Sequence, residues 1–174
     1  MALRKILTEP NKILREKSLL VDKVDSEIKK LMDDMLETMY AAPGIGLAAI
    51  QVGVAKRIIV LDLSPKEGPK NPMFLINPEI IDKSKNYSTY EEGCLSVPGQ
   101  FAEIDRPEKC SFKYLDYFGE PKEIHAEGML ATCIQHEMDH LEGILFIDYL
   151  SKLKKTMIVK KLSKQKKELE RIVV

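Results

Sequence analysis

The sequence of 174 residues contains no tryptophan, only three cysteines and only three histidines. An odd number of cysteines without regular spacing argues against a disulfide framework and leaves at least one thiol free for other chemistry. No apolar run approaches the roughly 18 residues of a membrane-spanning helix, so no membrane partner is expected. Polar residues at positions 8–11 interrupt the apolar N-terminal stretch, which is therefore not a secretory signal, and the sequence predicts a cytoplasmic protein.

The composition is that of a soluble globular protein, with 44% hydrophobic and 31% charged residues. A chain of this length is expected to form one domain, residues 1–174, and to bury roughly 70% of its unfolded surface. Its neutrality conceals an asymmetry. Residues 151–174 contain nine Lys or Arg and two Glu, a net charge of +7, which leaves −7 on the rest of the chain. The tail is thus electrostatically distinct from the body.

The most informative pattern lies at residues 135–140, with the sequence QHEMDH. On an α-helix a step of four residues turns through about 400°, so His136 and His140 lie on one face, about one turn apart. Both imidazoles can then bind one metal ion, while Glu137 points about 100° away and can handle protons. The pattern predicts a mononuclear metal hydrolase, which needs a third protein ligand.

Several candidates for the third ligand are unfavourable. The long metzincin pattern would place a histidine six residues after the second one, where this chain has Phe146. Glu168 and Glu170 lie in the lysine-rich tail, which suits a solvated face. Cys133 shares the histidine face, but an ion bound by all three would span about 10 Å of helix, so we expect Cys133 to pack beside the site.

Cys94 is the favoured third ligand. It lies in residues 92–96, EGCLS, where the preceding glycine permits a close backbone approach. A thiolate also binds soft and borderline metals tightly. Taken alone, a cysteine such as Cys94 is more often a small buried hydrophobic residue than a metal ligand. His125 remains an alternative ligand, although a lone histidine near a strand end is usually at the surface or the core edge.

Local patterns predict an α+β domain with antiparallel or mixed β-sheets around a central metal-binding helix, plus N-terminal and C-terminal helices. A helix capped by Asp25 or Ser26 should bury a methionine-rich stripe, and residues 44–51 suit a tight loop or a close backbone approach. Extended segments are expected at residues 57–63, 73–81, 87–96 and 110–117. The histidine helix should span residues 128–141 with Gly143 as its C-cap, and residues 151–174 should form a basic amphipathic helix.

Three segments together resemble the peptide deformylase family: residues 44–51 (GIGLAAIQ), residues 92–96 (EGCLS) and residues 135–143 (QHEMDHLEG). Members of that family are bacterial and organellar enzymes that remove the formyl group from new polypeptide N-termini. The resemblance covers essentially the whole chain, because many bacterial members also have a basic helical tail. It implies the peptide-deformylase-like α+β fold.

The resemblance implies a metal held by Cys94, His136 and His140, with Glu137 as general base and acid. It also implies that the side-chain amide of Gln51 and the backbone N–H of Leu95 bind the carbonyl oxygen. The implied substrate-binding residues are Gly44, Ile45, Gly46 and Glu92 at the cleft, and Tyr90, Met129, Thr132, Cys133 and His136 in a methionine pocket. The chain departs from the family at Phe101, where some members have arginine, and at Thr132, where many have an aliphatic residue.

A Cys-His-His ligand set ordinarily indicates zinc, whereas the resemblance implies Fe²⁺, with Ni²⁺ or Co²⁺ as active substitutes and Zn²⁺ often a poor one. The implied partners are formyl-methionyl nascent peptides and, through the basic tail, the ribosome; no DNA is expected. The alternative for the tail is a solvated helix face that packs on the body through its apolar stripe. Two alternatives stay open at this point. One is another HExxH metallopeptidase or amidase with a third ligand other than Cys94. The other is a ribosome-associated protein with a structural metal, which would have a fourth protein ligand and no need for Glu137.

Overall fold

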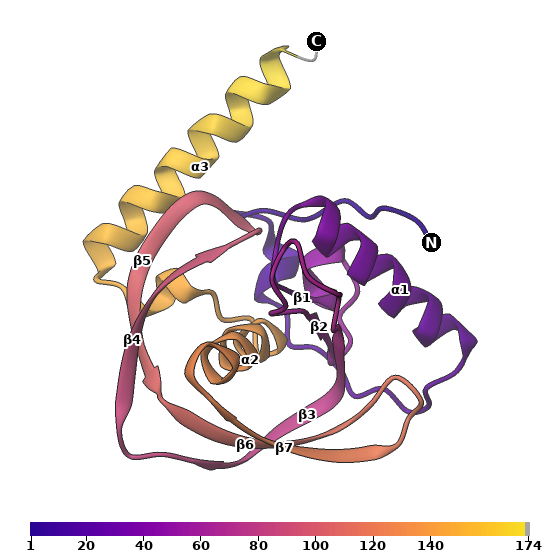
Figure 1. The fold of residues 1–174 in the computed structure, drawn as a ribbon. Helices are drawn as coiled ribbons and strands as arrows, with labels where there is room; N and C mark the ends of the chain where they lie inside the picture. The colour runs from indigo at the N-terminus through magenta and orange to yellow at the C-terminus, as the bar shows by residue number, and fades with distance from the viewer. Residues whose placement is uncertain (173–174) are drawn as a thin grey trace.

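The computed structural model describes residues 1–172, shown as a ribbon in Figure 1. The α-helices are α1 (Ser26–Ala41), α2 (Gly128–Leu141) and α3 (Lys152–Ile172). The strands are β1 (Gly46–Ala48), β2 (Ile58–Leu61), β3 (Met73–Lys83), β4 (Tyr87–Cys94), β5 (Val97–Pro107), β6 (Lys109–Leu115) and β7 (Pro121–Glu127). Short 3-10 helices are η1 (Lys12–Arg15), η2 (Ala49–Val52) and η3 (Phe146–Tyr149).

The strands form two antiparallel sheets that curve around α2 (Figure 1). The larger sheet has the order β1-β2-β3-β6-β7, and β4 pairs with β5 in a two-stranded sheet. All ladders between the described strands are antiparallel, and the parallel pairing recorded is an isolated bridge between Leu19 and Lys56. The predicted α+β fold, with sheets around a central helix, is confirmed.

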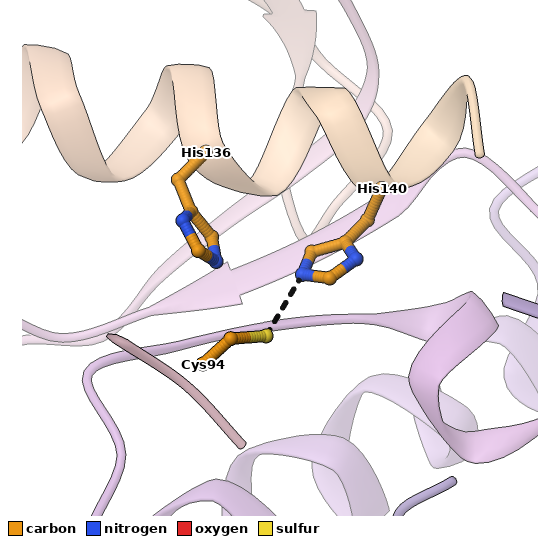
Figure 2. Close-up of side chains that lie close together, drawn as sticks. All are labelled: Cys94, His136 and His140. Atoms are coloured by element: carbon orange, nitrogen blue, oxygen red, sulfur yellow. Dashed lines mark hydrogen bonds between the residues drawn. The ribbon is translucent and has the colours of Figure 1, made fainter. Parts of the chain in front are cut away.

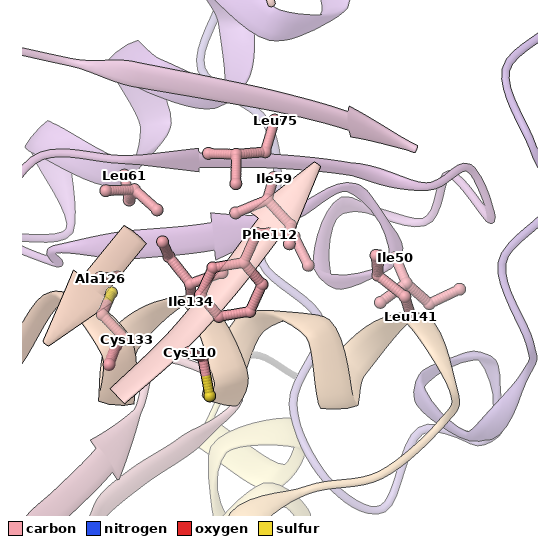
Figure 3. Close-up of a cluster of buried hydrophobic side chains, with 12 residues drawn as sticks. Ile50, Ile59, Leu61, Leu75, Cys110, Phe112, Ala126, Cys133, Ile134 and Leu141 are labelled. Atoms are coloured by element: carbon pink, nitrogen blue, oxygen red, sulfur yellow. The ribbon is translucent and has the colours of Figure 1, made fainter. Parts of the chain in front are cut away.

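The central helix α2 is buried on more than one face. Ile134 and Leu141 are fully buried and pack with Phe112 of the five-stranded sheet in one hydrophobic cluster (Figure 3). The helix begins at Gly128, directly after β7, and Gly143 follows its C-cap residue with φ of 74°, a conformation that favours glycine. The predicted helix at residues 128–141 is confirmed. A helix packed this tightly makes a rigid base for side chains on its remaining face.

The first helix, α1, packs its methionine-rich stripe into a second hydrophobic cluster, as predicted. Met32, Met35 and Met39 are fully buried there against β1 and β2. The Asp25 carboxylate accepts a hydrogen bond from the Ile28 N–H and so caps the first turn. This packing supports β1 from the side opposite to α2.

Of the two interpretations of residues 44–51, the close backbone approach is confirmed at Gly44 and Gly46, whereas a tight loop is wrong for most of that segment. Residues 46–48 form β1, which pairs with β2, and η2 follows directly. The sequence-based prediction contains no strand at β5 or at β7, because Pro98 and Gly99 interrupt β5 and three of the seven residues of β7 are charged. Their strand conformation depends on pairing with β4 and β6 rather than on an apolar alternation.

The basic helix α3 is present, but its apolar stripe is only partly used. Ile158, Val159 and Leu162 pack on a third cluster with η3 and β5, whereas Leu153 and Met157 stay exposed. The last two residues of the predicted helix, 173–174, lie outside the described part of the chain. None of the helices within residues 1–172 combines the length and apolarity needed to cross a bilayer. The assignment of residues 1–174 to one domain stays a prediction.

Candidate active site

Three potential metal ligands meet at the centre of the molecule (Figure 2). His136 and His140 lie one turn apart on α2, and Cys94 approaches them from the end of β4. The Cys94 Sγ lies 3.3 Å from His140 Nε2, and the ligand atoms of the three residues all lie within 4.8 Å of one another. Within residues 1–172 no fourth His, Cys, Asp or Glu belongs to this group, so an ion held here would keep an open position.

The position of Cys94 depends on the hairpin between β4 and β5. Gly93 pairs with Phe101, but Cys94 pairs with Val97, so the register shifts between these two steps and turns the thiol toward α2. A Cβ on Gly93 would lie 2.5 Å from the Phe101 ring. Glycine is therefore required before Cys94 because a neighbouring aromatic ring occupies the space, which explains the glycine noted in the sequence.

His136 is oriented by a buried set of charged side chains. Its Nδ1 lies 2.8 Å from Glu92 Oε1, which leaves Nε2 for a metal. Arg106 donates to both oxygens of Glu92, at 2.7 and 2.9 Å, and to Asp139 at 2.9 Å. Burial would raise the pKa of Glu92, but the hydrogen bonds from His136 and Arg106 outweigh it and lower the pKa. Glu92 therefore stays ionised against the histidine.

The two histidines differ in electrostatic surroundings. Burial lowers the pKa of His140 well below its ordinary value and favours the neutral ring, which is the form that binds metals. Burial would also lower the pKa of His136, but hydrogen bonds with Cys94 and Glu92 outweigh it and raise the pKa. The groups around His136 thus favour a positive charge, which fits either a proton on the ring or a cation between the ligands.

Glu137 lies on α2 beside the ligand group, not within it. Its side chain is buried, and its Oε2 has no hydrogen-bond partner in the described part of the chain. Burial raises the pKa of Glu137 to about 7. A Cβ on Gly46 would lie 2.5 Å from Glu137 Oε1, so β1 passes directly over this carboxyl group. An unpaired buried carboxyl beside a metal site is suited to proton transfer.

Gln51 and Leu95 both lie next to Cys94. The buried Gln51 side chain accepts a hydrogen bond from the Ala48 N–H and donates to Ser96 Oγ at 3.0 Å and to Cys94 Sγ at 3.6 Å. Its amide group is therefore held in place at the ligand group. Leu95 follows Cys94 in the turn, and its side chain would collide with a Cβ on Gly44 at 2.7 Å.

These groups lie along a cavity of about 480 Å³. The predicted substrate residues that line it are Gly44, Ile45, Gly46, Tyr90, Glu92, Met129, Thr132 and Cys133. Gln51, Cys94, Leu95, His136 and Glu137 line it as well. Cys133 belongs to the wall and to the core cluster and lies outside the ligand group, as the helical spacing predicts. Although Glu92 lines the cavity, its carboxylate is turned to His136 and Arg106.

The remaining ligand candidates lie elsewhere. His125 is exposed on β7, where its Nδ1 lies 2.6 Å from Ser111 Oγ, and Glu168 and Glu170 are exposed on α3. Phe146, at the metzincin position, stacks on the His136 ring with 6.1 Å between centroids.

Four side chains of the site are absent from the sequence-based prediction: Ser96, Arg106, Asp139 and Tyr149. Arg106 and Tyr149 meet Asp139 only through the tertiary structure, with Tyr149 donating to the Asp139 carboxylate at 2.7 Å. Of these four residues, only Asp139 could be placed near the site from the sequence, because it lies one turn after His136 on the same helix.

Comparisons with known proteins agree with this geometry. The family model described as polypeptide deformylase matches residues 3–156. The peptide deformylase of Pelagibacter ubique is 64% identical over 174 residues, with both chains covered completely. The chain belongs to the polypeptide deformylase family.

Solved structures of family members have the same fold. The peptide deformylase of Ehrlichia chaffeensis in complex with actinonin superposes with a TM-score of 0.91 at 48% identity, covering 95% of this chain and 98% of that one. The peptide deformylase of Legionella pneumophila gives a TM-score of 0.90 at 45% identity, covering 98% and 99%. The protein described by this sequence is thus a hydrolase that removes the N-formyl group from newly synthesised polypeptides. Its family is metal-dependent, and the group at Cys94 can hold an ion.

Glu92→Gln should weaken metal affinity about 10- to 100-fold, because the amide keeps the size of the side chain but removes the charge that orients His136 and holds Arg106. Competition with a chelator measures the affinity, and circular dichroism checks the fold. Glu91→Gln, at the exposed neighbouring position, is the matched control. Equal metal affinity in all three proteins would show that Glu92 does not support the site.

Proposed function

We propose that Cys94, His136 and His140 hold one divalent metal ion, and that the formyl group of the substrate is hydrolysed beside it. The observation that carries this proposal is the convergence of the three ligand atoms next to Glu137, at the wall of a cavity. A thiol and two imidazoles suit a borderline divalent ion. Such an ion supplies Lewis acidity, which polarises a carbonyl and makes water more acidic at neutral pH.

Glu137 is the residue that moves the proton. It takes the proton of the attacking water and delivers it to the nitrogen of the departing amine, so that formate and a free N-terminus result. Two observations support this role: the carboxyl group is buried beside the ligands, and one of its oxygens lacks a partner in the described residues. Neither His136 nor His140 is free for this task if both bind the metal.

Gln51 and Leu95 are proposed to stabilise the oxyanion that forms on the formyl oxygen when water attacks the formyl carbon. The Gln51 Nε2 already points at Cys94, and Ser96 and Ala48 fix its orientation. The backbone N–H of Leu95 follows the metal ligand in the chain. A donor that is held in place before the reaction costs no reorganisation, and losing one such donor typically raises the barrier by about 3 kcal/mol.

The cavity wall is proposed to hold the substrate methionine and to reject larger acyl groups. Tyr90, Met129, Thr132 and Cys133 would surround the methionine side chain, together with the edge of His136. Gly44, Ile45 and Gly46 border the cleft, and neither glycine has room for a Cβ. Backbone this close to Glu137 and Leu95 leaves little space beside a formyl carbon, so an acetyl group should be excluded by sterics.

Glu137→Gln should keep the metal but lower kcat about 10²- to 10⁴-fold, because the amide cannot carry the proton. Formate release from formyl-Met-Ala-Ser and metal content are measured on the same sample. Glu127→Gln, at an exposed position just before the same helix, is the control. A Glu137→Gln protein that retains full turnover would refute the role.

We propose Fe²⁺ as the working metal, with Ni²⁺ or Co²⁺ as active substitutes. Protein purified without oxygen should contain about one iron per chain, as three ligands around one open position suggest, and should lose activity when zinc replaces the iron. Metal analysis and formate release test this together. Anaerobically prepared protein that contains zinc, lacks iron and is fully active would overturn the choice.

We also propose that the outward face of α3 contacts the ribosome. Lys160 and Lys167 are exposed on this helix and lie about 120° to 140° around its axis from Lys154. Contact with ribosomal RNA would be salt-sensitive, because it depends on phosphate neutralisation. Lys160→Glu/Lys167→Glu should reduce co-sedimentation with ribosomes at low salt. Unchanged co-sedimentation would argue against the contact.

A further inference from the structure

A second groove adjoins the active-site cavity. It has a volume of about 640 Å³ and lies between β5 and α3, which run beside each other in Figure 1. Gln100 and Phe101 line both the groove and the cavity, so the two meet at these residues. Phe101 is largely exposed, and its ring lies over Gly93, next to the metal ligand Cys94. A chain that leaves the cavity over Phe101 therefore enters the groove.

One wall of the groove follows the edge of β5. Four consecutive residues, 100–103, line it, and consecutive side chains of a strand point to opposite faces. The groove thus runs along the strand rather than over one face. In the described part of the chain β5 pairs with β4 alone, so its second edge can offer backbone groups to an extended peptide. Backbone recognition of this kind suits a substrate whose sequence varies.

The other wall is one face of α3. Lys154, Met157, Ile158 and Lys161 line it, with the spacing i, i+3, i+4 and i+7 that places residues on one side of a helix. The two lysines lie about 10 Å apart along the axis, which an extended chain crosses in about three residues. Unlike Lys155, which pairs with Asp148, neither lysine forms a salt bridge within residues 1–172. Glu103 on β5 is the one acidic residue that lines the groove, so the lining is net positive.

We propose that this groove receives the part of the formylated nascent chain that follows the residues held in the active-site cavity, and that it favours acidic side chains there. Apolar contact with Phe101 and Met157 and the open edge of β5 hold the chain, and Lys154 and Lys161 select for negative charge. This inference rests on the active site proposed above. It adds a substrate preference that acts well beyond the methionine.

The test compares deformylation of free peptides in the absence of ribosomes. Formyl-Met-Ala-Ser serves as the short reference, and two hexapeptides extend it with either three glutamates or three lysines after the serine. The wild-type protein should show a higher kcat/KM for the acidic peptide than for the basic one. In Lys154→Glu/Lys161→Glu this acidic-to-basic ratio should fall about tenfold, and the difference should shrink as salt is raised.

The matched control is Lys160→Glu/Lys167→Glu, which makes the same charge change at the same seven-residue spacing, about 100° to 140° around α3 from the groove lysines and outside the groove lining. The control protein should keep the wild-type ratio. An equal fall in both variants would mean that the overall field of the helix acts, not the groove, and would overturn the proposal. A ratio that neither variant changes would also overturn it and leave the groove to another occupant, such as ribosomal RNA. If the wild-type protein fails to turn over the tripeptide, the assigned active site is wrong and the groove proposal fails with it. If the wild-type protein turns over the tripeptide but shows equal kcat/KM for the acidic and basic peptides, the groove proposal alone is refuted.

Discussion

The buried ion pair between Glu92 and Arg106 joins the parts of the chain that make the active site. Glu92 lies on β4 and Arg106 on β5, and the pair reaches α2 through His136 and Asp139. Removing two charges from water costs several kcal/mol per ion. Two short hydrogen bonds within the pair offset this cost, together with the hydrogen bonds of Glu92 to His136 and of Arg106 to Asp139. Loss of one member would leave an unpaired buried charge. The position of the hairpin relative to the helix, and so of Cys94 relative to the histidines, depends on this pair.

The active site also requires that the position of helix α2 is fixed by core packing. Ile134 and Leu141 anchor α2 in the larger core, and the stacked ring of Phe146 supports His136 from the third cluster. Because core packing fixes the backbone of α2, the side chains of His136, His140 and Glu137 have defined positions. Strand β1 completes the arrangement, since Gly46 brings its backbone against the carboxyl group of Glu137.

The sequence predicted those parts of the fold that depend on local signals. The bounds of α2, the Asp25 cap of α1 and the buried methionine stripe all follow from helical periodicity and capping. Strands β5 and β7 are absent from the prediction because Pro98 and Gly99 interrupt the first and three of the seven residues of the second are charged, so their conformation comes from a partner strand. Local patterns also leave the packing of α3 undetermined. The apolar periodicity predicts the helix, but it does not show that Leu153 and Met157 remain exposed to solvent.

For the site, the sequence alone determined that His136 and His140 share one face with Glu137 beside them, because a helix has a fixed period. It also supplied Cys94 as a chemically suitable third ligand. Only the tertiary structure decided that the thiol reaches the histidines, since that contact joins segments more than forty residues apart through a shifted hairpin register. The structure also shows that Glu92, which lines the cavity, directs its carboxylate to His136. Long-range contacts of this kind depend on how separate elements pack, and no local spacing in the chain records that packing.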